Sequence, residues 1–298
     1  MDLRAIGMGL LFALIWSSAF TSARIIVVDA PPLASLALRF FFSGLIGVTI
    51  ARALGQSMRL TSEQWKATFV FGMCQNALYL GLNFYAMQTI EASVASIIAS
   101  SMPLMVAVVG WLIFKERLPI FGMAGLVLGL IGVTMIMATR IEAGVDATGI
   151  ALCIIAAVAL TVATLSMRNA SSGGNLLMIV GLQMLVGSAI LAIASIATET
   201  FTVNFSSPLI VAFIYTTLAP GLLATWIWFK LVERIGAVRA ATFHFLNPFF
   251  EFRYFPPVLY DPLVGHLPVQ TFRHAHRHHG REVVVATGCD DRHNLLTH

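Results

Sequence analysis

The chain has 298 residues, of which 58% are hydrophobic and only 11% are charged, and its mean hydropathy is +0.86. Soluble globular domains carry about 25% charged residues, so this composition excludes an ordinary soluble enzyme or binding domain and predicts a membrane protein. The net charge of +4 does not indicate nucleic-acid binding, because the basic residues lie at the ends of apolar segments.

Eight long apolar segments follow one another along the chain, and a ninth begins near Gly236. The eight cover residues 5–23, 33–51, 67–87, 92–114, 120–138, 149–167, 176–197 and 208–229. A hydrocarbon core of about 30 Å needs about 20 apolar residues in a helix, and lipid leaves no backbone group unpaired. Because the runs are continuous rather than alternating, they predict helices and not barrel strands. The expected fold class is all-α, a polytopic membrane helical bundle.

The charges between these segments predict the orientation of the bundle. If the N-terminus is cytoplasmic, only Arg24 and Arg140 lie on the outer side. The cytoplasmic side then holds Arg4, Arg52, Arg59, Lys66, Lys115, Arg117, Arg168, Lys230, Arg234 and Arg239. This bias follows the positive-inside rule and predicts a bacterial inner-membrane protein with a cytoplasmic N-terminus. The short loops leave no room for a soluble catalytic domain before residue 250, so function is expected within the bundle.

The sequence repeats weakly at an offset of 145 positions. This shift places Pro103 on Pro248 and Phe84 on Phe229, and it also aligns Ile90 with Ile235, Ala92 with Ala237 and Ala95 with Ala240. An odd number of helices in each copy inverts the second copy, as in transporters whose substrate site lies at the midplane between repeats. We therefore expect two inverted five-helix repeats: a first repeat over residues 1–140, and a second, incomplete repeat of about four helices over residues 145–250.

The last part of the chain, residues 251–298, does not continue this pattern. Seven of the eight histidines lie within residues 266–298, and no apolar run there is long enough to span a membrane. We interpret this stretch as an aberrant polar tail, frameshifted or foreign. The HAHRHH run at residues 274–279 has a metal-like composition without a defined ligand geometry, so no metal site and no cofactor is expected.

Four stretches resemble one known family. They are LIWSSAF (14–20), LRF (38–40), NFYAMQTIEASVASIIASSMPLMVAVVGWLIFKERL (83–118) and GAVRAATFHFLNPFF (236–250). Their order and spacing are similar to those of the EamA family of the drug/metabolite transporter superfamily, over residues 1–250. The resemblance implies a ten-helix exporter or exchanger of amino acids, metabolites or drugs, with both termini cytoplasmic. It also implies a central cavity lined mainly by helices 1, 3, 4, 6, 8 and 9, with the last helix missing or aberrant here.

Polar residues within the apolar segments are the candidates for a substrate site. Those singled out are Trp16, Ser17, Asn76, Tyr79, Asn83, Ser100, His244 and Asn247. The i, i+3, i+7 spacing of Asn76, Tyr79 and Asn83 places them on one helix face. That face lines a cavity or forms hydrogen bonds to a neighbouring helix. Three prolines are candidate hinges for alternating access: Pro103, Pro220 and Pro248.

Two ionisable side chains are expected at membrane depth, Arg39 and His244. For Arg39 the default interpretation is snorkelling to the outer interface or capping of free carbonyls. His244 either binds a substrate carboxylate and titrates near neutral pH, or is hydrogen-bonded between helices. Trp226 and Trp228 are expected to anchor the cytoplasmic interface. The carboxylates up to residue 250 all map to loops or helix ends, which argues against carboxylate-driven antiport.

These observations predict a transporter, not an enzyme, that exports or exchanges small amphipathic metabolites such as amino acids by alternating access. Its expected partners are the small-molecule substrate and membrane lipid, with no nucleic acid and no obligatory protein partner. One alternative is a truncated, transport-defective member of the same family. A distant alternative is an intramembrane hydrolase, since serines and a histidine coexist in the bundle, although no GxSxG motif is present.

Overall fold

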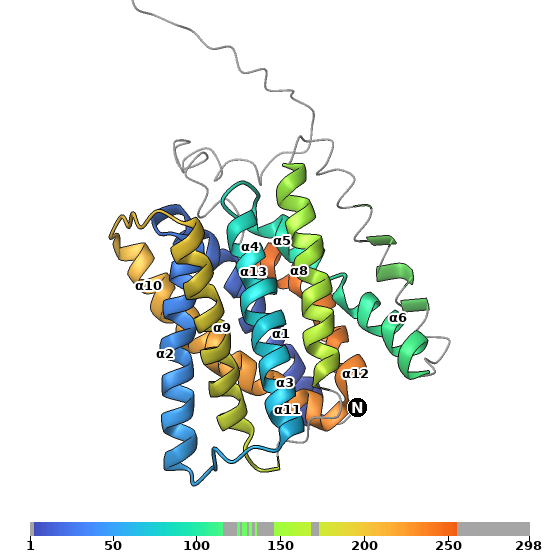
Figure 1. Ribbon diagram of the computed structural model, residues 1–298. Helices are drawn as coiled ribbons and strands as arrows, with labels where there is room; N and C mark the ends of the chain where they lie inside the picture. Colours follow the sequence, from blue (N-terminus) through green and yellow to red (C-terminus); the bar gives the residue numbers. More distant parts are fainter. Residues whose placement is uncertain are drawn as a thin grey trace, which may run out of the picture. The chain divides into compact units, whose positions relative to one another are not determined.

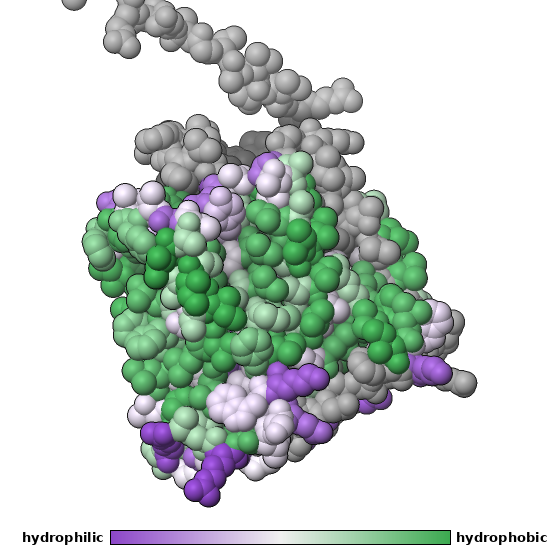
Figure 2. Space-filling model, viewed as in Figure 1, coloured by the Kyte–Doolittle hydropathy of each residue, from purple (hydrophilic) through white to green (hydrophobic). Residues whose placement is uncertain are grey.

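The computed structural model describes residues 3–115, 124–125, 127–129, 131–132, 135, 146–167 and 173–254. Every regular element in this part of the chain is a helix (Figure 1). Within these ranges, six helical stretches are long and apolar enough to cross a membrane: Leu3–Asp29, Pro32–Ala53, Ala92–Ile113, Ala147–Ser166, Leu176–Thr198 and Ser207–Ile235. Figure 2 shows apolar side chains over the middle of the viewed face and polar ones at its two ends. The predicted all-α membrane fold is confirmed.

The first two helices, α1 (Leu3–Asp29) and α2 (Pro32–Ala53), are joined by a tight turn at Ala30 and Pro31. Pro32 starts α2 with a φ angle already suited to a helix. No side chain within the turn caps α2. Instead, the Glu199 carboxylate accepts hydrogen bonds from the free backbone N–H groups of Leu33 and Ala34, at 2.7 and 2.9 Å.

The third helical segment runs through α3 (Ser62–Phe71), the π-helix η1 (Gly72–Leu80) and α4 (Gly81–Ala86). A capping box between Thr61 and Gln64 starts it. A second segment has the same construction: α10 (Ser207–Thr216), the π-helix η2 (Thr217–Leu223) and α11 (Ala224–Ile235). Each π-helix follows ten residues of α-helix, and the two segments begin 145 positions apart. The backbone thus repeats at the offset seen in the sequence.

Two further segments are interrupted shortly before a proline. The first consists of α5 (Ala92–Ala99) and α6 (Met102–Phe114), separated at Ser100 and Ser101, with Pro103 in the first turn of α6. The second consists of α12 (Ala237–Ala241), the 3₁₀-helix η3 (Thr242–Leu246) and α13 (Asn247–Tyr254), with Pro248 next to the start of α13. Proline fits the first turn of a helix, where its missing N–H needs no partner. The hinge role of these prolines stays a prediction.

The remaining helices are α8 (Ala147–Ser166) and α9 (Leu176–Thr198). Asp146 caps the start of α8: it accepts hydrogen bonds from the Thr89 hydroxyl and from the backbone N–H groups of Gly149 and Thr148, which lower the pKa of its carboxyl. α9 lies along α2 over much of its length (Figure 1). α1 packs on α10, α11 and α13, whereas α8 packs on η1, α4, α5 and α6.

The proposed repeat boundaries at residues 140 and 145 lie outside the described residues, so the division into domains stays a prediction. Most of the fifth predicted helix, residues 120–138, lies outside them as well. Of the predicted tail, residues 251–254 belong to α13. The rest of the tail, with its histidine run, lies outside the part of the chain that the structure describes.

Candidate substrate site

Four helical segments surround a small buried cavity: α1, α2, the third segment from η1 to α4, and η2. The cavity has a volume of about 20 Å³, and its lining consists of Trp16, Ala19, Phe20, Ala23, Arg39, Tyr79, Leu80, Asn83, Phe84, Met87 and Pro220. A space of roughly 10–15 Å³ on this measure holds one water molecule. The cavity therefore has room for little more than one water molecule. It brings together three predicted site residues, Trp16, Tyr79 and Asn83, and one predicted hinge, Pro220.

Three polar side-chain atoms of the residues that line this cavity lack hydrogen-bond partners. In the part of the chain that the structure describes, six buried side-chain atoms have no partner, and three of them belong to the cavity lining: Arg39 Nη1, Tyr79 Oη and Asn83 Oδ1. Leaving a buried polar group unpaired costs about 1–3 kcal/mol, and more if it is charged. Three such groups around one space make this cavity the candidate site for a polar ligand.

Arg39 does not snorkel to the interface, so that part of the default interpretation is wrong. Its side chain is only 2% exposed, and its Nε donates a hydrogen bond of 3.0 Å to the backbone carbonyl of Thr216. Pro220 explains this contact, because proline has no N–H with which to satisfy the carbonyl four residues earlier. Ser43 donates in the same way to the next carbonyl, that of Thr217, at 2.7 Å. Arg39 therefore caps a carbonyl of the π-helical break.

Four rings from three helical segments pack together beside the cavity. Phe12 lies 4.9 Å from Trp228 and 5.2 Å from His244 between ring centroids, and Trp16 lies 5.8 Å from His244. We refer to Phe12, Trp16, Trp228 and His244 as the aromatic cluster. Trp228 is 4% exposed, so the prediction that it anchors the membrane interface is wrong. Its ring packs inside the bundle because α1 and η3 cover that side of α11.

His244 is held by a residue of its own segment rather than by another helix. Its Nδ1 pairs with the Asn247 side-chain amide at 3.1 Å, and Ser17 donates to the Asn247 carbonyl at 3.1 Å. Three predicted site residues thus join α1 to the start of α13, next to the cavity lining but not in it. Within the described residues no serine hydroxyl is hydrogen-bonded to His244, so the hydrolase alternative gains no nucleophile–base pair.

Asn76 and Ser100 lie apart from these groups. The Asn76 amide donates to the backbone carbonyl of Gln183 on α9, at 3.0 Å, and to its side-chain oxygen. Asn76 and Asn83 were expected on one face because an α-helix has 3.6 residues per turn, but the wider turns of η1 rotate Asn76 toward α9. Ser100 donates to the Ile97 carbonyl of its own segment. Neither residue lines the cavity.

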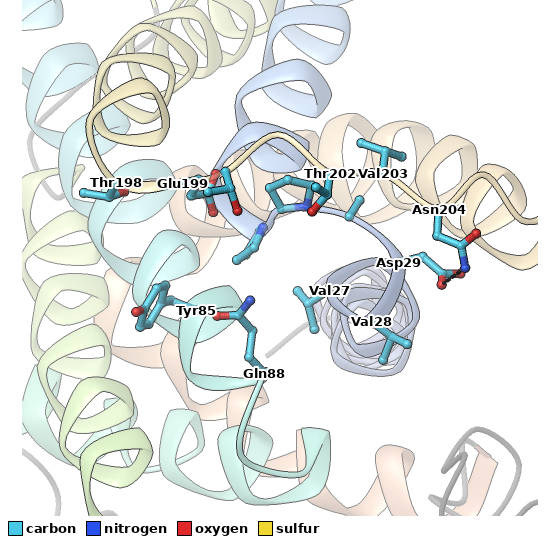
Figure 3. A pocket seen from close by; sticks show the side chains of 14 residues that line it. Val27, Val28, Asp29, Tyr85, Gln88, Thr198, Glu199, Thr202, Val203 and Asn204 are labelled. Atoms are coloured by element: carbon cyan, nitrogen blue, oxygen red, sulfur yellow. Dashed lines mark hydrogen bonds between the residues drawn. The ribbon is translucent and has the colours of Figure 1, made fainter.

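A wider pocket opens at the end of the bundle where α1 and α4 finish (Figure 3). Its volume is about 590 Å³, and Val27, Val28, Asp29, Ala30, Pro31, Pro32, Tyr85, Gln88, Thr198, Glu199, Thr200, Thr202, Val203 and Asn204 line it. Ser206 and Asn204 donate to the Asp29 carboxylate at 2.5 and 3.1 Å, which ties the loop before α10 to the end of α1. We call this space the end pocket.

The end pocket and the cavity follow each other along the same helices. On α1, Ala23 lines the cavity and Val27, about one turn further on, lines the end pocket. At the end of the third segment, Phe84 and Met87 line the cavity and Gln88 lines the pocket. Sequence reasoning missed the pocket because its residues come from loops and helix ends. It also missed Arg39 as a cavity residue, since the proline that explains its position lies far away in the sequence.

These features define a class: a multi-pass helical membrane protein with a small cavity inside the bundle and a wider pocket at one end. The chain belongs to the EamA-like transporter family, whose profile matches residues 3–138 and 147–251. The predicted resemblance is thereby confirmed.

Named relatives agree with this assignment. "Uncharacterized transporter YvbV" of Bacillus subtilis is 26% identical over 251 residues, which cover 84% of this chain and 82% of the relative. Protein PecM of Dickeya dadantii is 22% identical over 78% of this chain and 77% of its own length. A solved crystal structure superposes with a TM-score of 0.66 at 21% identity, covering 84% of this chain and 86% of that one. That likeness supports the fold alone.

Proposed function

We propose that the chain moves small amphipathic metabolites, such as amino acids, across a bacterial inner membrane by alternating access. The observation that carries this proposal is the buried cavity with three unpartnered polar atoms, placed one helical turn below the end pocket. A polar solute that enters from the end pocket would supply the partners that those atoms lack. Membership in the EamA-like transporter family supports a transport function.

The character of the cavity favours neutral or zwitterionic substrates with an apolar part. Aromatic rings form much of its wall, and Arg39 is its single basic residue. A phosphorylated solute would call for several inward Lys or Arg side chains. The carboxylates whose exposure the structure describes are all at least partly exposed: Asp29, Glu63, Glu91, Asp146, Glu199 and Glu233. Coupling through a buried acid therefore finds no support among those residues.

The two sides of the cavity differ in a way that suits alternating access. Toward the end pocket, the cavity is separated from open space by about one turn of α1 and of the third segment. On its other side, the aromatic cluster joins α1 to α11 and η3. Movement of one repeat against the other would open one side as the other closes. The interruptions near Pro103, Pro220 and Pro248 are the places where such bending costs least.

The test is uptake into proteoliposomes from a panel of amino acids and related metabolites. We expect Asn83→Ala to reduce flux at unchanged expression, because Asn83 lines the cavity, and His244→Ala to do so because it loosens the aromatic cluster. Thr49→Ala is the matched control, since Thr49 is exposed on α2 and bonds only to Leu45 of its own helix. Wild-type rates in both Asn83→Ala and His244→Ala proteins would contradict the assignment of this site.

A further inference from the structure

We propose that Arg39 is the group that binds the carboxylate of the substrate, with Asn83 and Tyr79 receiving the ammonium group of the same zwitterion. This inference rests on the proposed function and narrows it to apolar α-amino acids.

One edge of the Arg39 guanidinium is already used by the protein. Nε donates to the Thr216 carbonyl, which fixes the plane and position of the group at the break before Pro220. Nη1 has no partner, although the side chain is 2% exposed and lines the cavity. A guanidinium presents five N–H donors in a rigid, planar fork, and the ligands that match this fork best are carboxylates and phosphates. An anionic oxygen is therefore the partner that best matches the free donor.

The lack of a negative charge around Arg39 also favours an anionic ligand. The cavity lining contains no Asp or Glu. Besides its bond to the Thr216 carbonyl, Arg39 lies over the ring of Phe40, whose centroid is 4.9 Å from Cζ. A buried charge without a counter-ion is strongly unfavourable, and a single paired anion relieves much of that cost. A substrate carboxylate supplies one negative charge, which is the amount that one guanidinium balances.

The two remaining unpartnered atoms complement an ammonium group. The Asn83 amide nitrogen donates to the Tyr79 backbone carbonyl at 2.7 Å, so the orientation of the amide is set and Oδ1 is left as an open acceptor. The Tyr79 hydroxyl also accepts. An ammonium has three donors and no acceptor, so its chemistry matches two oxygens that lack a donor. Carboxylate and ammonium on one carbon are the signature of an α-amino acid.

The rest of the lining selects for an apolar side chain. Trp16, Phe20 and Phe84 contribute rings, and Leu80 and Met87 contribute aliphatic surface. Trp16 and Tyr79 are stacked, with ring planes 9° apart and centroids separated by 6.3 Å. A second charge on the substrate would meet no partner in this wall. The cavity must widen to admit such a molecule, and the interrupted segments beside Pro220 can supply that movement.

The experiment compares leucine and phenylalanine with molecules that lack one charged group. The probes are phenylalaninamide, which lacks the carboxylate, and 3-phenylpropionate, which lacks the ammonium. Binding to the purified full-length protein is measured by tryptophan fluorescence and calorimetry, and flux is measured in proteoliposomes. We expect wild-type protein to bind phenylalanine about 10- to 100-fold more tightly than its amide, the ratio that a hydrogen-bonded charge supplies.

Arg39→Gln should lower the affinity for phenylalanine by the same factor and leave the affinity for phenylalaninamide unchanged. Asn83→Leu should do the reverse, weakening compounds with an ammonium group while 3-phenylpropionate still binds. Because Arg39 also holds the Thr216 carbonyl, Ser43→Ala serves as the matched control. It removes the neighbouring contact to the Thr217 carbonyl outside the cavity lining, and it should lower thermal stability without changing the ratio of acid to amide affinity.

Equal binding of phenylalanine and its amide by wild-type protein would overturn the carboxylate site, as would no binding of any probe. Equal losses for acid and amide in Arg39→Gln would also overturn it, because they would reduce Arg39 to a structural group. Selective binding without flux of any panel compound would support the site and count against the proposed transport function. The two proposals therefore fail by different results.

Discussion

Asn76 and Asn83 are two asparagines of one helical segment that lie in different surroundings. Asn83 lines the cavity with its Oδ1 unpartnered, whereas Asn76 joins η1 to α9 through Gln183. The two roles that the sequence leaves open, lining a cavity and bonding to a neighbouring helix, are therefore divided between these two residues. For Asn83 the cavity contact is observed, and for Asn76 the contact between helices is observed.

We expect Asn76→Ala to lower the stability of the folded protein by about 0.6–1.7 kcal/mol, the range for side-chain hydrogen bonds between membrane helices. Flux per folded molecule should stay unchanged, because Asn76 does not line the cavity. Thermal unfolding in detergent and proteoliposome flux are the two measurements. Asn83→Ala is the counterpart, with flux reduced and stability nearly kept. Lost flux at wild-type stability in Asn76→Ala would place Asn76 in the transport path instead.

The sequence contained some of this residue-scale information and lacked the rest for a physical reason. Tyr79 and Asn83 were predictable, because polar side chains in an apolar helix must face something other than lipid. The place of Arg39 was not, because its partner carbonyl is freed by Pro220, which lies in another helix of the bundle. Local rules let an arginine near a helix end reach water, and only the packing of α2 on η2 prevents this.

At the scale of helices, the apolar runs predicted the segments well but not their interruptions. Hydropathy reports whether a stretch is buried in lipid, and it is insensitive to whether a turn has 3.6 residues or more. The π-helices at Gly72–Leu80 and Thr217–Leu223 therefore left no clear signal, apart from Pro220. Prolines did mark two of the remaining breaks, since residues near 100 and 245 precede Pro103 and Pro248.

The helices α2 and α9 approach each other closely along much of their length. This approach depends on glycines: a Cβ added at Gly181 would lie 2.7 Å from the Val48 backbone nitrogen and 3.0 Å from the Gly44 carbonyl oxygen. Small residues at such crossings let two backbones pack directly, which is a main source of helix association in membranes. Ser188 adds a hydrogen bond of 2.8 Å to the Ala37 carbonyl of α2.

Gly181→Ala should therefore force α2 and α9 apart. We expect a loss of about 1–3 kcal/mol, as for other overpacked sites, seen as a lower midpoint of thermal unfolding in detergent. Gly7→Ala is the control, because a Cβ at Gly7 on α1 would meet no atom within 4 Å. If both variants unfold at the wild-type temperature, the α2–α9 contact is more tolerant than the geometry indicates.

In the whole molecule, the first helix of each predicted repeat packs mainly on helices of the other predicted repeat, and we call the two predicted repeats the halves. α1 packs on α10, α11 and α13, and α8, which starts at the corresponding offset, packs on η1, α4, α5 and α6. Corresponding segments run in opposite directions: α4 lies at the same end as α10, and α3 at the same end as α11 (Figure 1). The first helix of each half is thus held mainly by the other half. Such packing links any movement of one half to the site beside α1.

Gly9 offers a way to test this movement. A Cβ at Gly9 on α1 would overlap the ring of Phe243 in η3, so Gly9→Ala must displace that ring. Gly9 lies at the end of α1 opposite to the end pocket, next to the aromatic cluster. A change that disfavours the packing of α1 on η3 should shift the population toward the conformation in which the cavity is open on the side of the aromatic cluster.

In that conformation the end pocket closes, if the halves rock about the cavity as proposed. Gln88→Cys, in a background without other cysteines, reports this, since Gln88 is exposed in the end pocket. We expect Gly9→Ala to slow the labelling of this cysteine by a water-soluble thiol reagent several-fold, because a destabilisation of about 1–3 kcal/mol is large enough to reverse a two-state balance. Gly7→Ala should leave the rate unchanged. A lowered unfolding temperature with wild-type labelling would mean that Gly9 serves packing alone, and that the two ends of the cavity are not coupled through α1.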